Sequence, residues 1–246
     1  MQVLGLDVGG SGIKGAPVDL ASGALLSERF RIPTPQPATP TAVIGVATEV
    51  VRHFNLPGPI GCGFPAAIKG GTVQTAANID PAWIGVRIED EMQAAIGRPV
   101  RVLNDADAAG LAEMRWGAGR DHPGVVLILT FGTGIGSALF VDGRLVPNTE
   151  FGHIEVRGKE AEHRAADSVR ERKNLSWKQW AQRVDEYLDA LQKVIWPDLI
   201  VVGGGASNFA SKFVPLLTSR TPIVPAQLLN NAGIAGAALA AAPDGA

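Results

Sequence analysis

The chain has 246 residues, enough for one large domain or two small ones, and 46% of them are hydrophobic while 19% are charged. This composition and a formal net charge of -2 exclude an intrinsically disordered chain and a strongly basic nucleic-acid-binding protein. The single cysteine, Cys62, excludes an internal disulfide and any multi-cysteine zinc or iron–sulfur site, and it fits a reducing compartment.

The sequence predicts neither a secretory signal nor a membrane span. The first apolar run begins at Gln2 without a basic segment before it, and no apolar run reaches the roughly 18 to 20 residues of a membrane span. Gly233, Gly236 and Pro243 interrupt the Ala-rich C-terminal segment. We therefore expect a cytoplasmic protein with neither a membrane nor a nucleic acid as its partner.

The two halves of the chain begin with similar segments. Residues 3–13 read VLGLDVGGSGI and residues 126–135 read VLILTFGTGI, so each copy is an apolar strand followed by a polar glycine turn. A second alternating strand follows each turn, over 14–20 and 136–141, and ends at Ser22-Gly23 or Asp142-Gly143. Each half is therefore predicted to open with a β-hairpin.

The rest of the first half alternates between strands and helices. Four prolines between Arg31 and Thr41 predict an extended loop, because proline cannot continue a central strand. Apolar periodicity then predicts, in order, a helix from about Thr41, strand 60–64, a turn at Gly70-Gly71, helix 89–96, strand 100–103 and helix 106–116. The glycine-bounded segment 117–124 is the expected hinge between the halves.

The second half continues in the same way. After its hairpin, which begins with strand 125–130, we expect a polar, charged insert over 157–174, a long helix over 177–196 capped by Ser176, strand 199–202 and further helices. Alternating strands and helices indicate an α/β protein. The repeat favours two lobes that face a cleft, 1–117 and 118–246, with the last helix packing back on the first lobe; the alternative is a single doubly wound sheet.

Each predicted hairpin carries a glycine-rich turn suited to binding phosphate. Glycines let successive backbone N–H groups converge on an anion, and hydroxyl and lysine side chains add hydrogen bonds and charge. The candidate residues are Asp7, Gly9, Gly10, Ser11 and Lys14 in the first turn, and Thr130, Gly132, Thr133 and Gly134 in the second. Neither turn has the spacing of a P-loop or of a dinucleotide-binding motif. An ordinary glycine hairpin is the alternative for either turn alone, but a matched pair favours a clamp on a phosphate chain.

Three polar residues follow the strand over 100–103 and begin the next helix. Asn104 and Asp105 are therefore expected at the carboxyl end of a strand, where α/β proteins bind ligands. Asp105 can act as a general base toward a sugar hydroxyl, with Asn104 and Asp107 as hydrogen-bonding support. Capping of the helix is the alternative role, and it suits Asp107 best.

Acid, amide and imidazole groups elsewhere match the hydroxyls of a sugar. Glu150 and His153 lie three residues apart with a glycine between them, and Asn78 follows an expected strand end in the first half. A metal site at Glu150 and His153 lacks a third nearby ligand in the sequence. Trp83 is expected in the core. Gly204, in the triplet 203–205, lets the backbone approach a ligand in the second half, or simply ends the strand.

Seven motifs in order give the chain a resemblance to the ROK-type sugar kinases of the actin-like ATPase fold, over essentially its whole length. They are DVGGSGIKG, GFPAA, AANID, NDAD, LTFGTGIG, EFGHIEV and VVGGG. The segments EFGHIEV, EAEHRAADSVRERKNLSWKQW and IWPDLIVVGGG are similar to those of the polyphosphate glucokinases within that family. The cysteine-rich zinc cluster of most ROK proteins is missing, which also fits the polyphosphate-using branch.

The resemblance implies transfer of a terminal phosphoryl group from inorganic polyphosphate, and in some members from ATP, to the 6-hydroxyl of glucose, giving glucose 6-phosphate. It implies Mg²⁺ held by Asp7 directly or through water, no zinc, and a homodimer. Asp105 is then the catalytic base. The implied sugar contacts are Asn78, Asn104, Asp105, Glu150, His153 and Glu162, and the implied phosphate contacts are both glycine turns and Gly204.

Two other functions share some of these features. An ATP-dependent ROK hexokinase acting on glucose, mannose or another sugar differs only in its donor. A filament-forming protein of the same fold needs the phosphate loops but not the sugar-facing NDAD and EFGH segments. The basic residues between Arg157 and Lys173 suit a polyanion, although interspersed glutamates also fit a solvated helix face.

Overall fold

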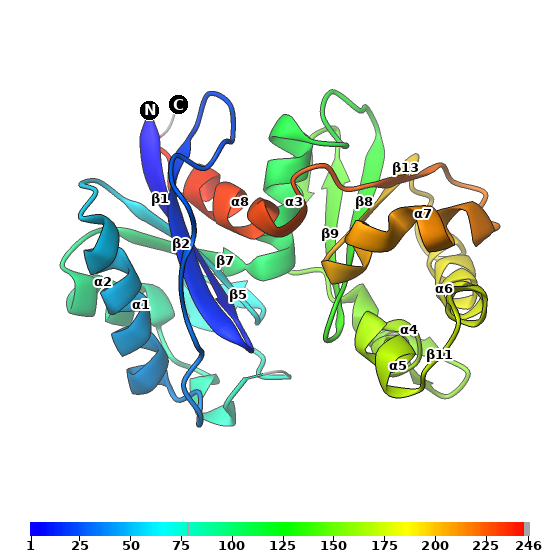
Figure 1. Ribbon diagram of the computed structural model, residues 1–246, viewed down its shortest axis with the longest axis horizontal. Helices are drawn as coiled ribbons and strands as arrows, with labels where there is room; N and C mark the ends of the chain where they lie inside the picture. Colours follow the sequence, from blue (N-terminus) through cyan, green and yellow to red (C-terminus); the bar gives the residue numbers. More distant parts are fainter. Residues whose placement is uncertain (78, 244–246) are drawn as a thin grey trace. The chain divides into compact units, whose positions relative to one another are not determined.

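The computed structural model, which describes residues 1–77 and 79–243, divides into two compact units (Figure 1). Unit 1 contains Met1–Ala112 and the C-terminal residues from Asn231, and unit 2 contains Glu113–Asn230. The division falls a few residues before the boundary expected at 117/118. Among the described residues, no helix combines the length and apolar character needed to cross a membrane.

Unit 1 is built on a five-stranded sheet with the strand order β3-β2-β1-β4-β7. The β1–β2 and β2–β3 pairs are antiparallel, and β4 and β7 continue the sheet in parallel. The elements are β1 (Gln2–Gly9), β2 (Gly12–Asp19), β3 (Phe30–Ile32), α1 (Pro40–Phe54), β4 (Ile60–Phe64), β5 (Ile68–Lys69), β6 (Thr72–Val73), the 3₁₀ helix Pro81–Trp83, α2 (Ile88–Ile96), β7 (Val100–Asn104), α3 (Asp105–Trp116), which runs into unit 2, and α8 (Ala232–Ala240).

Unit 2 repeats the same sheet. Its strand order is β10-β9-β8-β13-β14, again with two antiparallel pairs followed by two parallel ones. The strands are β8 (Val125–Phe131), β9 (Ile135–Val141), β10 (Arg144–Val146), β11 (Glu155–Val156), β12 (Lys159–Glu160), β13 (Leu199–Gly203) and β14 (Ile223–Pro225). The helices are α4 (Glu162–Ala165), α5 (Asp167–Arg172), α6 (Trp177–Gln192) and α7 (Ala210–Phe213), with 3₁₀ helices at Phe151–His153, Gly205–Phe209, Val214–Leu216 and Leu229–Asn231.

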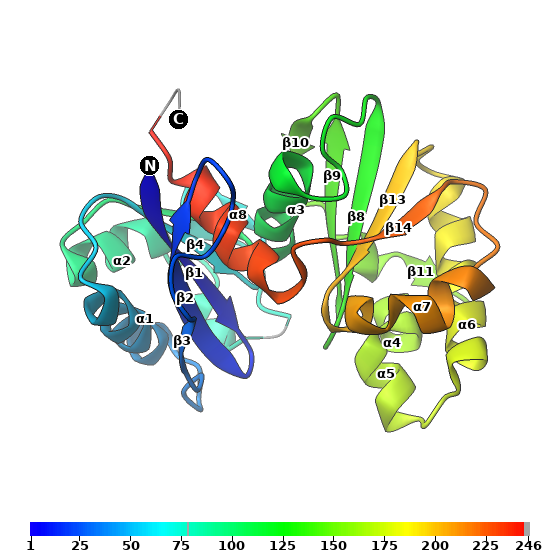
Figure 2. The ribbon, with the colours of Figure 1, turned by 45° about the horizontal axis from the view of Figure 1, so that its top comes forward.

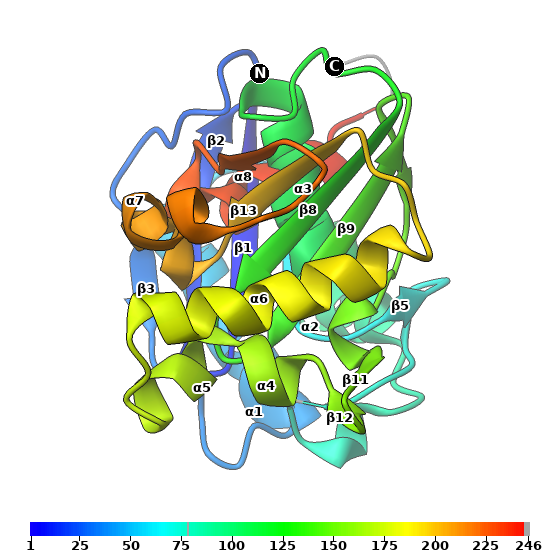
Figure 3. The same ribbon diagram turned by 90° about the vertical axis from the view of Figure 1, so that its right-hand side faces the viewer.

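The two identical topologies confirm the predicted repeat, the opening hairpins and the α/β class. The alternative of a single doubly wound sheet is wrong, because each sheet has its own antiparallel hairpin at one side. Each unit also has its own core. In unit 1 the indole of Trp83 is buried and donates a hydrogen bond of 2.9 Å to Ala38 O, as expected for a core aromatic. In unit 2 α6 lies across the sheet (Figure 3), and its Trp180 and Tyr187 side chains are buried in the core of that unit.

Some predicted boundaries were wrong. Phe30–Ile32 forms the edge strand β3 just before the proline-rich loop, because an edge strand needs partners on one side only. The long helix has its predicted cap at Ser176, where the structure shows that Gln179 completes a capping box, but it ends at Gln192, four residues early. There the N–H groups of Val194 and Ile195 both bond to Leu191 O in a turn before Pro197. The charged insert contains two short helices, α4 and α5.

The C-terminal helix α8 packs on the sheet of unit 1 at very short range (Figure 2). Glycines make this approach possible: a Cβ on Gly61 would lie 1.7 Å from Ala237 O, and a Cβ on Gly236 would lie 1.6 Å from Ala108 O. Neither distance is compatible with a side chain. The segment that follows unit 2 is therefore fixed on unit 1 by backbone-to-backbone packing.

Replacing Gly236 by Ala is expected to lower the free energy of unfolding by about 3 kcal/mol, because α8 and α3 must separate to admit the methyl group. Gly45 provides a matched control. It lies on the exposed side of α1, and no atom lies within 4 Å of the place that an added methyl group would take, so Gly45→Ala should raise stability by about 0.5 to 1 kcal/mol. Urea denaturation of both variants checks the two opposite signs, and equal changes would contradict the packing described.

Candidate active site

The first glycine turn is the tight connection of the β1–β2 hairpin. Gly9 pairs with Gly12, which leaves Gly10 and Ser11 exposed at the tip. Two side chains that the sequence analysis missed order this turn: Thr34 Oγ1 donates to Gly9 O, and the Arg31 guanidinium donates to Ser11 O. Both come from the chain around β3, so only the tertiary fold reveals them. The carbonyls are thus engaged by the protein while the tip faces solvent.

A carboxylate and an ammonium group lie beside this turn. Lys14 Nζ is 3.0 Å from Asp7 Oδ2, and both side chains are largely buried. The N-terminal turn of α8 lies against the same carboxylate, since a Cβ on Gly233 would be 3.0 Å from Asp7 Oδ2. A helix N-terminus favours negative charge. The Asp7 carboxylate offers an oxygen donor, the type of ligand that Mg²⁺ prefers.

Asp7 and Asp105 lie at the same edge of the sheet. In the parallel register Asp7 pairs with Gly63 and Gly63 pairs with Leu103, so β1, β4 and β7 end side by side. Asp105 follows directly after β7. Gly63 lies between the two acids, and even a Cβ there would be 3.6 Å from the Cα of Asp105. This strand edge is where parallel α/β sheets bind ligands.

Asn104 has the capping role that the sequence analysis gave as an alternative. Its Oδ1 accepts hydrogen bonds from the N–H groups of Ala106 (2.8 Å) and Asp107 (3.1 Å), and its Nδ2 donates to Ala66 O. The side chain is buried and rigidly held. Asp105 Oδ1 accepts from Ala106 N at 2.8 Å and the residue is half-buried. Asn104 thus fixes the start of α3, and Asp105 presents its carboxylate from that fixed point.

The second glycine turn, in unit 2, joins β8 to β9. Gly132 N donates to Gly134 O, which closes the turn, and α5 supports it through Ser168, whose N–H donates to Gly132 O and whose hydroxyl donates to Thr133 O. Gly203 pairs with Thr130 in the sheet. Gly204 has a φ of 74° and packs on the backbone of Phe131. The structure therefore brings the predicted Gly204 together with the second turn.

Acidic and imidazole groups gather next to this turn. His153 Nε2 lies 3.8 Å from Glu150 Oε2, and His153 Nδ1 lies 3.4 Å from Glu160 Oε2. Glu162 is nearly buried, and its Oε2 accepts a hydrogen bond of 3.4 Å from Ile135 N. Burial raises the pKa of Glu150, an effect that His153 opposes and Glu162 reinforces. The predicted pair is thus part of a larger polar group, and Glu160 is a member that the sequence analysis did not single out.

The phenol of Tyr187, from α6, lies close enough to Glu162 to feel its charge. Its hydroxyl is buried and finds no hydrogen-bond partner among the described residues. Burial, with a smaller effect of the negative charge of Glu162, raises the pKa of this phenol.

The same polar group contains the third metal ligand that the sequence spacing did not reveal. His153, Glu160 and Glu162 each offer one ligand atom, and these three atoms lie within 4.8 Å of one another. The hairpin of β11 and β12 brings Glu160 back to His153, which the sequence spacing alone did not suggest. These three residues could hold a cation, although all three groups also suit hydroxyl recognition.

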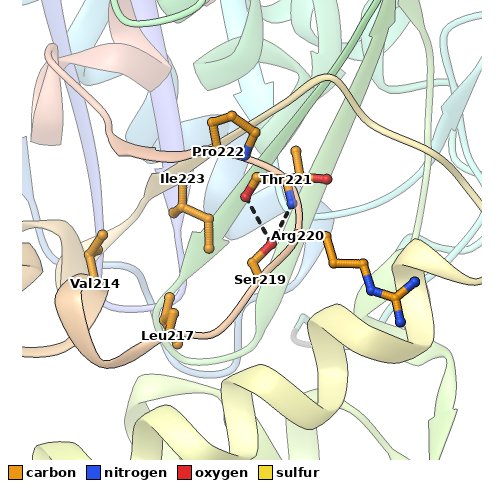
Figure 4. Close-up of a pocket in the computed structure, with 7 residues that line it drawn as sticks. All are labelled: Val214, Leu217, Ser219, Arg220, Thr221, Pro222 and Ile223. Atoms are coloured by element: carbon orange, nitrogen blue, oxygen red, sulfur yellow. Dashed lines mark hydrogen bonds between the residues drawn. The ribbon is translucent and has the colours of Figure 1, made fainter.

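Two further regions complete the comparison with the predicted site. Asn78 lies outside the described residues. A cavity of about 280 Å³ in unit 2 is lined by residues between Val214 and Ile223, with Arg220 at its rim and Ser219 hydrogen-bonded to Thr221 (Figure 4). None of the predicted site residues lines it, and we assign it no part in the chemistry.

Comparison with known proteins agrees with the resemblance that the sequence motifs indicate. The model of the ROK family matches residues 3–167. A polyphosphate glucokinase from Mycobacterium tuberculosis is 55% identical over 241 residues, which cover 98% of this chain and 91% of the relative.

Two solved structures show the same architecture. The inorganic polyphosphate/ATP-glucomannokinase from Arthrobacter sp. strain KM superposes with a TM-score of 0.94 at 48% identity and covers 97% of each chain. A ROK family glucokinase from Streptomyces griseus, in complex with glucose and AMPPNP, has a TM-score of 0.84 at 25% identity and covers 98% of this chain and 99% of its own. The two-unit fold is therefore that of the actin-like ATPases.

Proposed function

Because the chain belongs to the ROK family, we propose that it transfers the terminal phosphoryl group of inorganic polyphosphate to the 6-hydroxyl of glucose. The observation that carries the proposal is the edge of the unit 1 sheet at which β1, β4 and β7 end. Asp105 and the Asp7–Lys14 pair lie at this edge, and only β4, with Gly63, separates them. A base and a phosphate-binding group are needed together for this reaction. The relatives named above support both the donor and the acceptor.

Asp105 is the general base in this reaction. Its carboxylate accepts the proton of the 6-hydroxyl as that oxygen forms its bond to the terminal phosphorus. The bond from that phosphorus to the bridging oxygen breaks, and polyphosphate shorter by one unit leaves. Asn104 keeps Asp105 in place, because its side chain is hydrogen-bonded on both sides of the strand end.

The glycine turns bind the donor through backbone N–H groups. Such contacts recognise phosphate oxygens and require no nucleobase, which suits a donor made of phosphate alone. Lys14 adds positive charge beside the first turn, and Asp7 would hold Mg²⁺ directly or through water. When bound, the metal ion neutralises charge on the donor oxygens.

In unit 2, Glu150, His153 and Glu162 bind the sugar. Replacing Glu150 or His153 by Ala should raise the KM for glucose about 5- to 150-fold, because the loss of a buried hydrogen bond costs about 1 to 3 kcal/mol. The KM for polyphosphate should change little. Steady-state kinetics with each substrate varied in turn checks this, with His122→Ala as the control, since that ring is hydrogen-bonded to the neighbouring Pro123 O in its own loop. A raised donor KM with an unchanged glucose KM would place the two residues in the donor site instead.

Among the described residues, the basic side chains between Arg157 and Lys173 include some that form ion pairs and some that form none. Arg157 and Arg164 both pair with Glu186, at 2.7 and 2.6 Å. Arg170 is 2.7 Å from Asp167 and stacks over Trp177, 4.2 Å from the ring centre. Arg172 and Lys173, at the end of α5, are exposed and form no ion pair with the described residues. Since α5 also supports the second glycine turn through Ser168, these two charges are the ones best suited to a polyphosphate chain.

The double variant Arg172→Ala, Lys173→Ala is therefore expected to raise the KM for polyphosphate and to reduce its dependence on salt, while the KM for ATP changes little. A long polyanion contacts several charges, whose effect salt screens over about 8 Å at 0.15 M. Arg157→Ala is the matched control, because its guanidinium is already paired. Measurement of both KM values over a range of salt concentrations checks the prediction; identical salt slopes for polyphosphate in the double variant and the wild type would exclude these residues.

A coupled assay tests the proposed function as a whole. Glucose 6-phosphate formation is followed with polyphosphate or ATP as donor and with glucose or mannose as acceptor. We expect turnover with polyphosphate and glucose. Turnover with ATP alone would instead identify an ATP-dependent hexokinase, and nucleotide hydrolysis without any effect of sugar would favour a filament-forming protein.

A further inference from the structure

His153 lies between two carboxylates. Glu160 Oε2 is 3.4 Å from its Nδ1 on one side of the ring, and Glu150 Oε2 is 3.8 Å from its Nε2 on the other. A carboxylate can only accept hydrogen bonds, whereas a neutral imidazole has one donor and one acceptor nitrogen. Glu150 and Glu160 therefore compete for the single N–H group of the neutral imidazole.

The shorter distance favours Glu160 in this competition, and the local backbone fixes the main chain from which its side chain extends. Glu160 ends the β11–β12 hairpin, whose turn residues Arg157 and Gly158 have φ values of 53° and 72°, as a tight hairpin turn requires. The next residue is also anchored, since Ala161 N donates to Ile154 O at 2.9 Å.

The ring itself is anchored from the other side. His153 ends a 3₁₀ helix in which Gly152 packs directly on β9, because a Cβ at that position would lie 2.2 Å from Ile135 O. The main chain is thus fixed next to both Glu160 and His153, which keeps the two side chains within reach of each other.

We propose that Glu160 is a positioning residue: it accepts the Nδ1–H of His153 and so leaves Nε2 as a bare hydrogen-bond acceptor. This inference rests on the proposed function, in which His153 contacts the sugar. Nε2 and Glu150 Oε2, 3.8 Å apart, then form a pair of acceptors for two neighbouring hydroxyl groups, each of which donates one hydrogen bond.

His163 does not disturb this arrangement. Its Nδ1 lies 3.5 Å from the same Glu160 oxygen and its Nε2 lies 3.9 Å from Glu162 Oε1. A carboxylate oxygen has two lone pairs and can accept from both rings. The His163 side chain is 64% exposed, against 37% for His153, so water can replace its contact.

The arrangement has a consequence for specificity. A site with two acceptors and no donor binds a vicinal diol and disfavours a group that can only accept. A glucose analogue with fluorine in place of one of the contacted hydroxyls should therefore bind more weakly, since fluorine cannot donate.

The tautomer can be observed directly by ¹⁵N NMR of the histidine side chains in the whole protein, without sugar and after treatment with a chelator. The chain has four histidines, and the spectrum of His153→Asn assigns the signals of His153. In the wild type we expect a protonated Nδ1 and an unprotonated Nε2. Glu160→Ala should shift the population toward Nε2–H, while Glu160→Gln, whose amide oxygen can still accept, should keep the wild-type tautomer.

Kinetics provide the second measurement. Glu160→Ala should raise the KM for glucose about fivefold to tenfold, with kcat and the donor KM within about twofold of the wild type, and Glu160→Gln should restore most of the loss. Glu155→Ala is the matched control, because Glu155 is the exposed strand partner of Glu160 and should change neither measurement.

A wild-type spectrum with Nε2–H, or a tautomer unaffected by Glu160→Ala, would overturn the proposal whatever the enzyme phosphorylates. Failure to phosphorylate glucose would overturn the proposed function but not the tautomer result, so the two failures are distinguishable.

Discussion

Replacing Asp105 by Asn is expected to lower kcat about 10²- to 10⁴-fold, because an amide cannot accept the proton of the attacking hydroxyl. The fold should be spared. Asp105 Oδ1 accepts a hydrogen bond from Ala106 N, and the amide oxygen of Asn can accept the same bond. Steady-state kinetics at saturating glucose and polyphosphate, together with thermal unfolding, measures the two effects separately.

Asp90→Asn is the control for that variant. Asp90 is an exposed acid on α2 that pairs with Arg87, and its loss should leave kcat unchanged. A kcat of Asp105→Asn close to that of the wild type would remove Asp105 from the role of base. A large loss of stability in the same variant would point instead to a structural role at the start of α3.

The largest effect on stability is expected from Glu113→Ala. The Glu113 carboxylate is buried and accepts hydrogen bonds from three backbone N–H groups: Ala118 N at 2.9 Å, Gln227 N at 3.0 Å and Leu228 N at 2.7 Å. Removing it leaves these donors unsatisfied, and hydrogen bonds to a charged group are stronger than neutral ones. We expect the free energy of unfolding to fall by about 3 kcal/mol or more.

Two comparisons make this measurement specific. Glu113→Gln keeps one strong acceptor oxygen and should lose about half as much stability. Glu91→Ala makes the same change at an exposed position of α2 and should alter stability by less than about 0.5 kcal/mol. Denaturant unfolding of the three variants ranks their free energies of unfolding. A Glu113→Ala variant as stable as Glu91→Ala would contradict a stabilising role for the three hydrogen bonds to Glu113.

The sequence was most informative where the fold depends on local patterns. Alternating apolar residues and glycine turns predicted both hairpins, because strand period and turn chemistry are short-range properties. The helix cap at Ser176 was predicted for the same reason. Asn104 was ambiguous, because an Asn at a strand end has the same sequence appearance whether it caps the next helix or binds a ligand.

Long-range contacts could not be predicted in this way. Glu113 reads as an exposed helical acid in the sequence, yet two of its three partners, Gln227 and Leu228, lie more than a hundred residues away. Arg31 and Thr34 were assigned only to an extended loop, although their side chains order the first glycine turn. Glu160 was one acid among several in a charged insert until the β11–β12 hairpin placed it beside His153.

The most direct test of the account is the identity of the product formed without any nucleotide. Purified protein is incubated with glucose, Mg²⁺ and polyphosphate freed of nucleotides, and the mixture is followed by ³¹P NMR. We expect glucose 6-phosphate to appear with a matching loss of internal phosphate signal, because each transfer shortens the polymer by one unit and leaves a new terminal group, and we expect no such change with Asp105→Asn. Absence of glucose 6-phosphate in this mixture, from protein that forms it when ATP is added, would contradict the assignment of polyphosphate as the donor.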